Sequence, residues 1–165
     1  MIQRALTSWA ALVVWAALAA GAALAAGAAA QSANDPNTLW EQATLYRDEW
    51  GVPHVYANNA RAMAFALGYA QAEDHMEGMS IAYRVAKGRA AELFGEDYVP
   101  SDEMALRLGH DDLARAAYAN ADSLTRDLCE GFALGANSWL LENAADKPDW
   151  VEPVSPPDIL ALTHA

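Results

Sequence analysis

The spacing of apolar residues changes once along this chain, at Asn58-Asn59, and that change limits the folds it can adopt. Before it, two short extended segments, Ala43–Arg47 and His54–Ala57, flank a turn that contains Gly51 and Pro53. After it, apolar residues recur at intervals of three and four, which is the spacing of amphipathic helices. We therefore expect an α+β fold with one N-terminal β-hairpin followed mainly by helices.

Helical spacing begins after Asn58-Asn59, either of which can cap a helix, and continues to Gly88, a residue type common just after a helix. Further helices are predicted over residues 89–94 before Gly95, over 111–119, over 123–141 with Asp122 or Ser123 as the cap, and from Pro156 to Ala165. Residues 146–157 are rich in proline and predict a surface connection. The first long stretch places these residues on its apolar faces: Met63, Leu67 and Ala70, then Met76, Met79, Tyr83 and Ala86.

The last predicted helix is apolar and is followed by no Gly, basic residue or cap. A native domain seldom stops inside such a helix. We therefore expect the sequence to be a fragment, truncated at its C-terminal side.

The first 30 residues are typical of a signal peptide. Arg4 supplies the positive charge, Trp9 to Ala30 is uncharged and apolar, and Ala28-Ala29-Ala30 offers a cleavage site of the A-x-A type. The run is also long enough for an uncleaved membrane anchor, but its Ala and Gly content and the lack of a following basic cluster favour cleavage. We expect an exported protein, periplasmic or secreted, with no stable membrane insertion after cleavage and a flexible leader over residues 31–42.

The negative net charge of the protein limits the kinds of partner it can bind. The formal net charge is −12, and every Asp and Glu follows Ala30. Nucleic acids and anionic membranes bind basic surfaces, so neither is an expected partner. Cys129 is the only cysteine, which excludes an internal disulfide, and its neighbours predict a buried structural thiol.

Several blocks of residues occur here in an order found in one known family. The blocks are YRDEWGVPHVYA (46–57), AFALGYAQAEDHM (64–76), YRVAKGRAAELFG (83–95), the spaced pair Asp102 and Arg107, GFALGANSW (131–139) and a segment from Trp150 to Leu160. Together they resemble the penicillin acylase family from about Leu45 to Leu162. Two departures are His75, where the family usually has Arg, and the lead-in 130–135 before Asn137; both leave the acyl specificity open.

The resemblance implies a fold and an activity. Members of this family are cut from one precursor into a smaller alpha chain and a larger beta chain, whose N-terminal Ser is the nucleophile. Residues 43–165 would be the alpha-chain region, a helix-rich part of an αββα N-terminal nucleophile hydrolase fold. The implied partners are the larger chain and a small acylated amide substrate. The α-amino group of the Ser suits the role of base because its ordinary pKa is near neutrality.

The resemblance assigns no catalytic residue to this chain, because the nucleophile lies on the larger chain. It assigns no cofactor or metal here either, although calcium, bound in some members mostly by the larger chain, is possible in the complete protein. Substrate-binding residues stay unassigned. Structural roles are implied for these motif residues: Arg47, Asp48, Gly51, Pro53, His54, Gly68, Tyr69, Asp74, Gly88, Glu92, Gly95 and Asn137.

Other local patterns have simpler interpretations. Acidic residues around His75 resemble metal ligands, but neighbours on a helix point in different directions and zinc sites favour His at i and i+4. We expect Asp74 to pair with Arg47 or Arg84 instead, and His54 to be a packed turn residue. No serine lies in a Gly-x-Ser-x-Gly context.

The sequence thus predicts an exported amidase of penicillin acylase type, matured by autoproteolysis, that acts on β-lactams, acyl-homoserine lactones or lipopeptides. This piece alone is expected to be inactive. Two alternatives remain open: a non-enzymatic periplasmic helical binding protein that retains the motif, and an alanine-rich, membrane-anchored structural protein.

Overall fold

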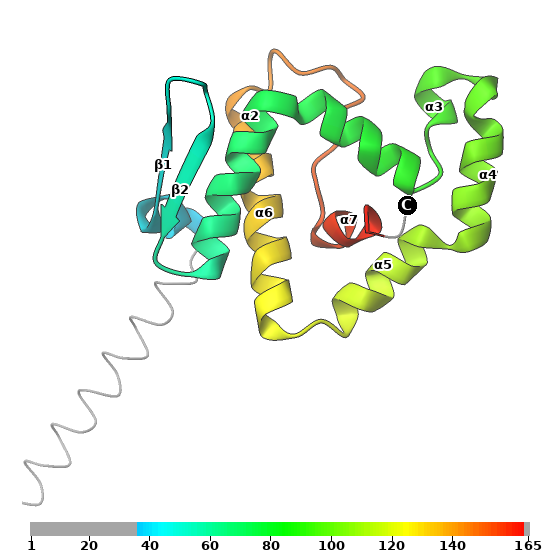
Figure 1. The fold of residues 1–165 in the computed structure, drawn as a ribbon. Coiled ribbons are helices and arrows are strands. Elements are labelled where there is room, and N and C mark those ends of the chain that lie inside the picture. Colours follow the sequence, from blue (N-terminus) through cyan, green and yellow to red (C-terminus); the bar gives the residue numbers. More distant parts are fainter. Residues whose placement is uncertain (1–35, 164–165) are drawn as a thin grey trace, which may run out of the picture. The chain divides into compact units, whose positions relative to one another are not determined.

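The computed structural model describes residues 36–163 (Figure 1). The predicted signal peptide, residues 31–35 of the predicted leader and the last two residues lie outside the described residues. The chain divides into two compact units, residues 1–38 and 39–165. The fold set out below is that of the second unit.

A β-hairpin opens this unit, as the sequence predicts. Strand β1, Ala43–Arg47, pairs antiparallel with β2, Pro53–Ala57, in a register that places Ala43 opposite Ala57 and Arg47 opposite Pro53. The second strand begins at Pro53, one residue before the predicted start. Among the described residues this two-stranded sheet is the only sheet.

Helices make up most of the remainder (Figure 1). The predicted caps are confirmed at two of them, because Asn59 accepts a hydrogen bond from the Ala62 N–H and Asp122 accepts one from the Thr125 N–H. In chain order the helices are α2 (Ala60–Ala86), α3 (Ala91–Phe94), the 3-10 turn η2 (Glu96–Tyr98), α4 (Val99–Leu108), α5 (His110–Ala119), α6 (Ser123–Glu142) and α7 (Pro156–Ala161). The sequence prediction missed α4 and extended α7 too far.

Helices α2 and α6 lie against each other along much of their length and form the centre of the unit (Figure 1). A Cβ atom on Gly68 would collide with the Phe132 carbonyl, and one on Gly135 would collide with the Phe65 carbonyl. Glycine at these positions therefore lets the two backbones approach closely. This contact corrects the predicted face of α2: Ala62 and Ala66 are buried, whereas Met63 is 41% exposed.

Helix α2 is kinked. His75 has φ −146° and ψ 27°, values outside the helical range, so two helical segments meet there. The second segment carries Met76 and Tyr83 into the main core, in agreement with the predicted second face. The break explains why the apolar face changes in the middle of the helix.

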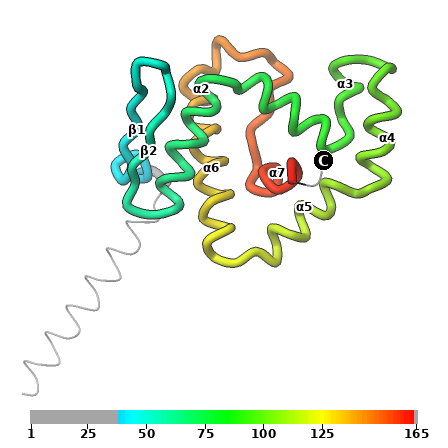
Figure 2. Tube along the Cα trace, viewed as in Figure 1, coloured from blue at the N-terminus to red at the C-terminus, as the bar shows by residue number. Residues whose placement is uncertain are grey.

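The segment between α6 and α7, residues 143–155, corrects a second expectation. Figure 2 shows this part of the chain (orange) turning back after α6 and running to α7 (red). Val151 and Val154 are almost fully buried in the core with Tyr83, Ala136 and Leu140. We call residues 150–158 the strap, because Val151 and Val154 close the core between α2 and α6, whereas Glu152 and Pro153 lie on the surface as predicted.

The predicted leader also ends earlier than expected. Residues Pro36–Gln42 form a 3-10 helix, η1. Leu39 within it is completely buried against Ala62 and Phe65. Its burial gives the end of the predicted leader a fixed position in the second unit.

Among the helices that the structure describes, none is long and apolar enough to cross a membrane.

Candidate functional site

Most of the motif residues singled out from the sequence lie in three places: the hairpin turn, the contact of the hairpin with α2, and a charged cluster where α2 meets α3 and the strap. Asn137 adds a fourth contact, from α6 to the strap. Their geometry decides whether they can perform chemistry or only build the scaffold.

Asp48 organises the hairpin turn. Its Oδ1 accepts hydrogen bonds from the backbone N–H groups of Trp50 and Val52, both at 2.9 Å. Its Oδ2 lies 3.0 Å from His54 Nε2, which must donate because a carboxylate can only accept. The hydrogen bond from His54, helped by those from the backbone, holds the pKa of Asp48 below its usual range. Gly51, at φ +78°, completes the turn.

His54 is held between Asp48 and the Tyr46 ring. The His54 and Tyr46 rings stack with centroids 5.0 Å apart and an interplanar angle of 9°. No described serine or cysteine donates a hydrogen bond to His54 or to any other described histidine. The residue expected in the turn thus lies on strand β2, with its ring stacked on Tyr46 and 39% of its side chain exposed.

Arg47 joins the hairpin to α2. Its guanidinium lies 2.9 Å from an Asp74 carboxylate oxygen and 2.7 Å from Glu73 Oε2, and it donates to the Gly51 carbonyl at 2.8 Å. The hydrogen bond to Glu73, then that to Asp74, raises the Arg47 pKa. The predicted Arg47–Asp74 pair is confirmed. It is half-exposed, with 28% of the Arg47 side chain and 36% of the Asp74 side chain accessible, so little desolvation accompanies it.

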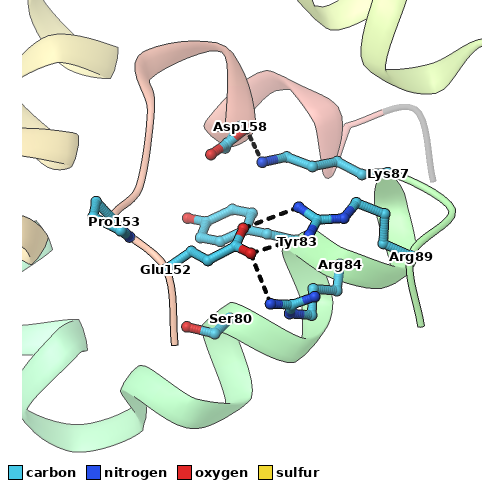
Figure 3. Close-up of a pocket in the computed structure, with 8 residues that line it drawn as sticks. All are labelled: Ser80, Tyr83, Arg84, Lys87, Arg89, Glu152, Pro153 and Asp158. Atoms are coloured by element: carbon cyan, nitrogen blue, oxygen red, sulfur yellow. Dashed lines mark hydrogen bonds and ion pairs between the residues drawn. The ribbon is translucent and has the colours of Figure 1, made fainter. Parts of the chain in front are cut away.

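Arg84, the other candidate partner of Asp74, lies elsewhere. It is buried and donates to Glu92 at 2.7 Å, to the Trp150 carbonyl at 2.9 Å and to Glu152 at 2.9 Å. Arg89 also binds both glutamates, and Figure 3 shows the two arginines on either side of Glu152. The two arginines therefore fix the strap to α2 and to the start of α3.

Ion pairs and burial shift the pKa values of the acidic residues and the tyrosine in this cluster. The hydrogen bonds from Arg89, with those from Arg84, lower the pKa of Glu92. Arg89 is also the main cause of the lowered pKa of Glu152. Burial, followed by the nearby Asp158 carboxylate, raises the pKa of Tyr83 to about 12. The glutamates are therefore ionised and Tyr83 is neutral near pH 7.

Lys87 and Asp158 make a second tie between α2 and the strap. Lys87 Nζ lies 2.6 Å from Asp158 Oδ1, and the Ser155 N–H donates to Asp158 Oδ2 at 2.9 Å. Asp158 is 3% exposed. Both of its oxygens thus have a charged or polar partner, as a buried carboxylate needs.

Asp102 is a buried acidic residue whose role sequence reasoning did not find. It accepts hydrogen bonds from the N–H groups of Ala90 and Ala91, at 2.9 and 2.8 Å, and so anchors α4 to the start of α3. Arg107, quoted with it as a spaced pair, instead contacts Glu103 on the surface. Gly88 at φ +68° lies beside the Asp102 carbonyl, where a side chain would collide.

The remaining motif residues complete the scaffold. Gly68 belongs to the contact between α2 and α6, and Gly95, at φ +84°, follows α3. The Tyr69 hydroxyl donates a hydrogen bond to Glu142 at 2.7 Å. This hydrogen bond is the main reason that the pKa of Tyr69 is raised to about 12. Pro53 starts β2.

No arrangement for nucleophilic catalysis occurs among residues 36–163. Neither the serines nor Cys129 has a histidine as a hydrogen-bond partner, and burial, first of all, raises the pKa of the Cys129 thiol. The described His, Cys, Asp and Glu residues form no group able to hold a metal ion. The charged residues described above pair with one another, which is the chemistry of a structural framework.

The family model of penicillin amidase matches residues 42–164, most of the chain. The fold and the motif geometry lie within this match, and the chain belongs to the penicillin amidase family. Its relatives are acylases of two kinds.

Penicillin G acylase of Escherichia coli is 34% identical over 96 residues, which cover 58% of this chain and 11% of that protein. The acyl-homoserine lactone acylase PvdQ of Pseudomonas syringae pv. syringae is 27% identical over 149 residues, which cover 82% of this chain and 19% of that protein. The chain therefore spans between a tenth and a fifth of the length of these relatives.

A solved structure has the same fold. The thermostable penicillin G acylase from Alcaligenes faecalis matches with a TM-score of 0.66 and 27% sequence identity, covering 73% of this chain and 69% of that chain. The helix-rich unit with an N-terminal hairpin is thus a penicillin acylase fold, as predicted.

Proposed function

We propose that this protein is the N-terminal part of an exported amidase of penicillin acylase type, which hydrolyses the amide bond of N-acylated substrates after autoproteolytic maturation. The observation that carries the proposal is the family match over residues 42–164. Within it, the motif residues hold the hairpin, α2, α6 and the strap together. The proposed role of this protein is that of the alpha chain, a scaffold for a nucleophile on a larger chain.

The substrate is proposed from the relatives. A penicillin G acylase and an acyl-homoserine lactone acylase both match, and both names describe acylases. We therefore propose a small acylated amide as substrate, with β-lactams, acyl-homoserine lactones and lipopeptides as the classes to test. Any calcium in the assembled enzyme would be bound mostly by the larger chain.

The hairpin offers a surface for that larger chain. The rings of Tyr46, His54 and Tyr56 stack in a row along one face, with Tyr56 61% exposed and Tyr46 48% exposed. Beyond them, Trp50 at the turn is 81% exposed. Aromatic side chains exposed together are typical of protein interfaces. The hairpin also has only two strands, and such a unit gains stability from further packing.

The test is an amidase assay of the purified protein against acyl-homoserine lactones and phenylacetyl and aliphatic amides. The protein alone is expected to show no turnover, and turnover is expected when a larger chain carrying an N-terminal Ser is supplied. Turnover by the protein alone that is lost on replacing one of its own serines would contradict the proposal. For export, N-terminal sequencing of the mature protein is expected to begin near Gln31.

The tyrosine row can be tested in the same assay. Replacing Tyr46 and Tyr56 together by Ser is expected to weaken association with the larger chain and reduce the recovered activity. Leu141→Ser is a matched control, because Leu141 is 79% exposed at the end of α6 and distant from the row in sequence. Equal loss in both variants would show that the row has no special part in the interface.

A further inference from the structure

The hydroxyl of Ser80 is a buried polar group without a partner. Ser80 lies on α2 and is 6% exposed, and its Oγ makes no hydrogen bond with any described residue. Buried hydroxyls in folded proteins almost always have a partner, either from the protein or from ordered water. The position of Ser80 therefore calls for a partner that residues 36–163 do not supply.

Ser80 lines a small cavity between α2 and the strap (Figure 3). The cavity has a volume of about 20 Å³. A single water molecule needs roughly 10–15 Å³ of such space, so the cavity has room for one water.

The charged residues around the cavity determine whether a small ion or a neutral molecule is the more favourable ligand. Its cations are Arg84, Lys87 and Arg89, and all three are ion-paired, with Glu92, Glu152 or Asp158. The three positive charges are thus matched by three carboxylates. An added halide or metal ion would introduce an unbalanced charge beside these pairs, which is unfavourable. A neutral ligand is favoured.

The walls offer the further polar contacts that a buried water requires. Tyr83 lines the same cavity and is 6% exposed, and its hydroxyl is a further polar group there. Glu152 also lines it, from the strap. A water needs two to four polar partners, and hydroxyl and carboxylate groups on both sides of the cavity provide this number.

We propose that one ordered water molecule occupies this cavity, bonded to Ser80 Oγ, and completes the contact between α2 and the strap. The arginine and lysine ties would fix the charged part of the interface, and the water would satisfy its neutral hydroxyl groups. This proposal does not depend on the enzymatic role of the family.

The test compares Ser80→Ala with Ser138→Ala in the whole chain. Ser138 is the matched control, because it also lies within a helix and its Oγ donates to the Leu134 carbonyl at 2.9 Å. If a water molecule is bonded to Ser80, the Ser80→Ala substitution removes a partner of that water. The Tm of the Ser80→Ala variant should then lie about 2–4 °C below that of Ser138→Ala. If the cavity is dry, Ser80→Ala removes an unsatisfied buried hydroxyl, and its Tm should lie above that of the control.

A second measurement detects the water itself. Nuclear Overhauser transfer from water to the amide protons of Ser80 and Ile81 in the labelled protein is expected, and its loss in Ser80→Ala would support the proposal. Absence of this transfer in the parent protein would overturn it. So would saturable shifts of these amides on exchanging chloride for bromide, because they would identify a halide as the ligand.

Discussion

The side chain of Asn137 on α6 exchanges two hydrogen bonds with the backbone of Val154. Its Oδ1 accepts from the Val154 N–H at 2.8 Å, and its Nδ2 donates to the Val154 carbonyl at 2.8 Å. The amide thereby pairs with the strap as a neighbouring strand would. Because Val154 is 4% exposed, both of its backbone groups depend on this one side chain.

Replacing Asn137 by Ala is expected to reduce the free energy of unfolding by about 1–3 kcal/mol, since it leaves buried backbone groups without partners. Urea denaturation measures the change. Asn143→Ala is the control, because the Asn143 side chain makes a single hydrogen bond among the described residues, to the Trp139 carbonyl at the end of the same helix. Similar losses of unfolding free energy in the two variants would show that the contact with Val154 contributes no more to stability than the Asn143 hydrogen bond.

The close contact between α2 and α6 predicts opposite effects for two glycines. Gly135→Ala would place a methyl group against the Phe65 carbonyl and is expected to destabilise the protein by about 1–3 kcal/mol. Gly78, also within a helix, has open space where its side chain would be. Gly78→Ala should therefore stabilise by roughly 0.5–1 kcal/mol, through helix propensity. Thermal melts of both variants provide the test, and a stabilising Gly135→Ala would contradict the observed packing.

Acid is expected to loosen the strap. Interaction with Arg89 lowers the pKa values of Glu92 and Glu152 in the folded state relative to the unfolded state. The unfolded chain thus binds more protons, so this contribution to stability is complete above about pH 5 and disappears as the pH falls through the ordinary glutamate range and below. Because both carboxylates are about half accessible to solvent, the effect is moderated by solvent screening.

The measurement is the urea midpoint between about pH 6 and pH 3 for the parent and Glu152→Gln. The variant should lose less stability over this range, since it has one carboxylate fewer to protonate. Glu103→Gln, at an exposed pair on α4, is the control and should follow the parent. Parallel curves for all three proteins would mean that Glu152 makes no pH-dependent contribution.

Local signals in the sequence predicted a large part of this fold. The turn with Gly51 and the caps Asn59 and Asp122 depend on contacts within a few residues, and all three are found. Helix α4 was missed because its buried positions, Asp102 and Ala105, are not an apolar stripe. Its larger apolar residues are exposed: Met104, Leu106 and Leu108.

Long-range contacts account for the other errors. The exposure of Met63 follows from the glycines of α6, which bring the alanine face of α2 inward. Arg84 pairs with Glu152, which is 68 residues away, so no local pattern could have identified its partner. The residues that the resemblance singles out make contacts within the fold, but their partners in the strap could be identified only from the fold.

The contact between Arg47 and α2 gives a last prediction. Arg47 reaches Glu73 and Asp74 with different parts of one planar guanidinium, and it also donates to the Gly51 carbonyl. A lysine keeps the charge but not this geometry. Arg47→Lys should therefore lower the urea midpoint, and Arg47→Ala should lower it further. Arg107→Ala should leave it unchanged, because Arg107 is 76% exposed and makes an isolated surface pair with Glu103. Combining Arg47→Ala with Asp74→Asn separates the pair from its surroundings: if the two residues interact, the double variant will lose less than the sum of the single losses. Strict additivity would show that Arg47 and Asp74 contribute to stability independently of each other.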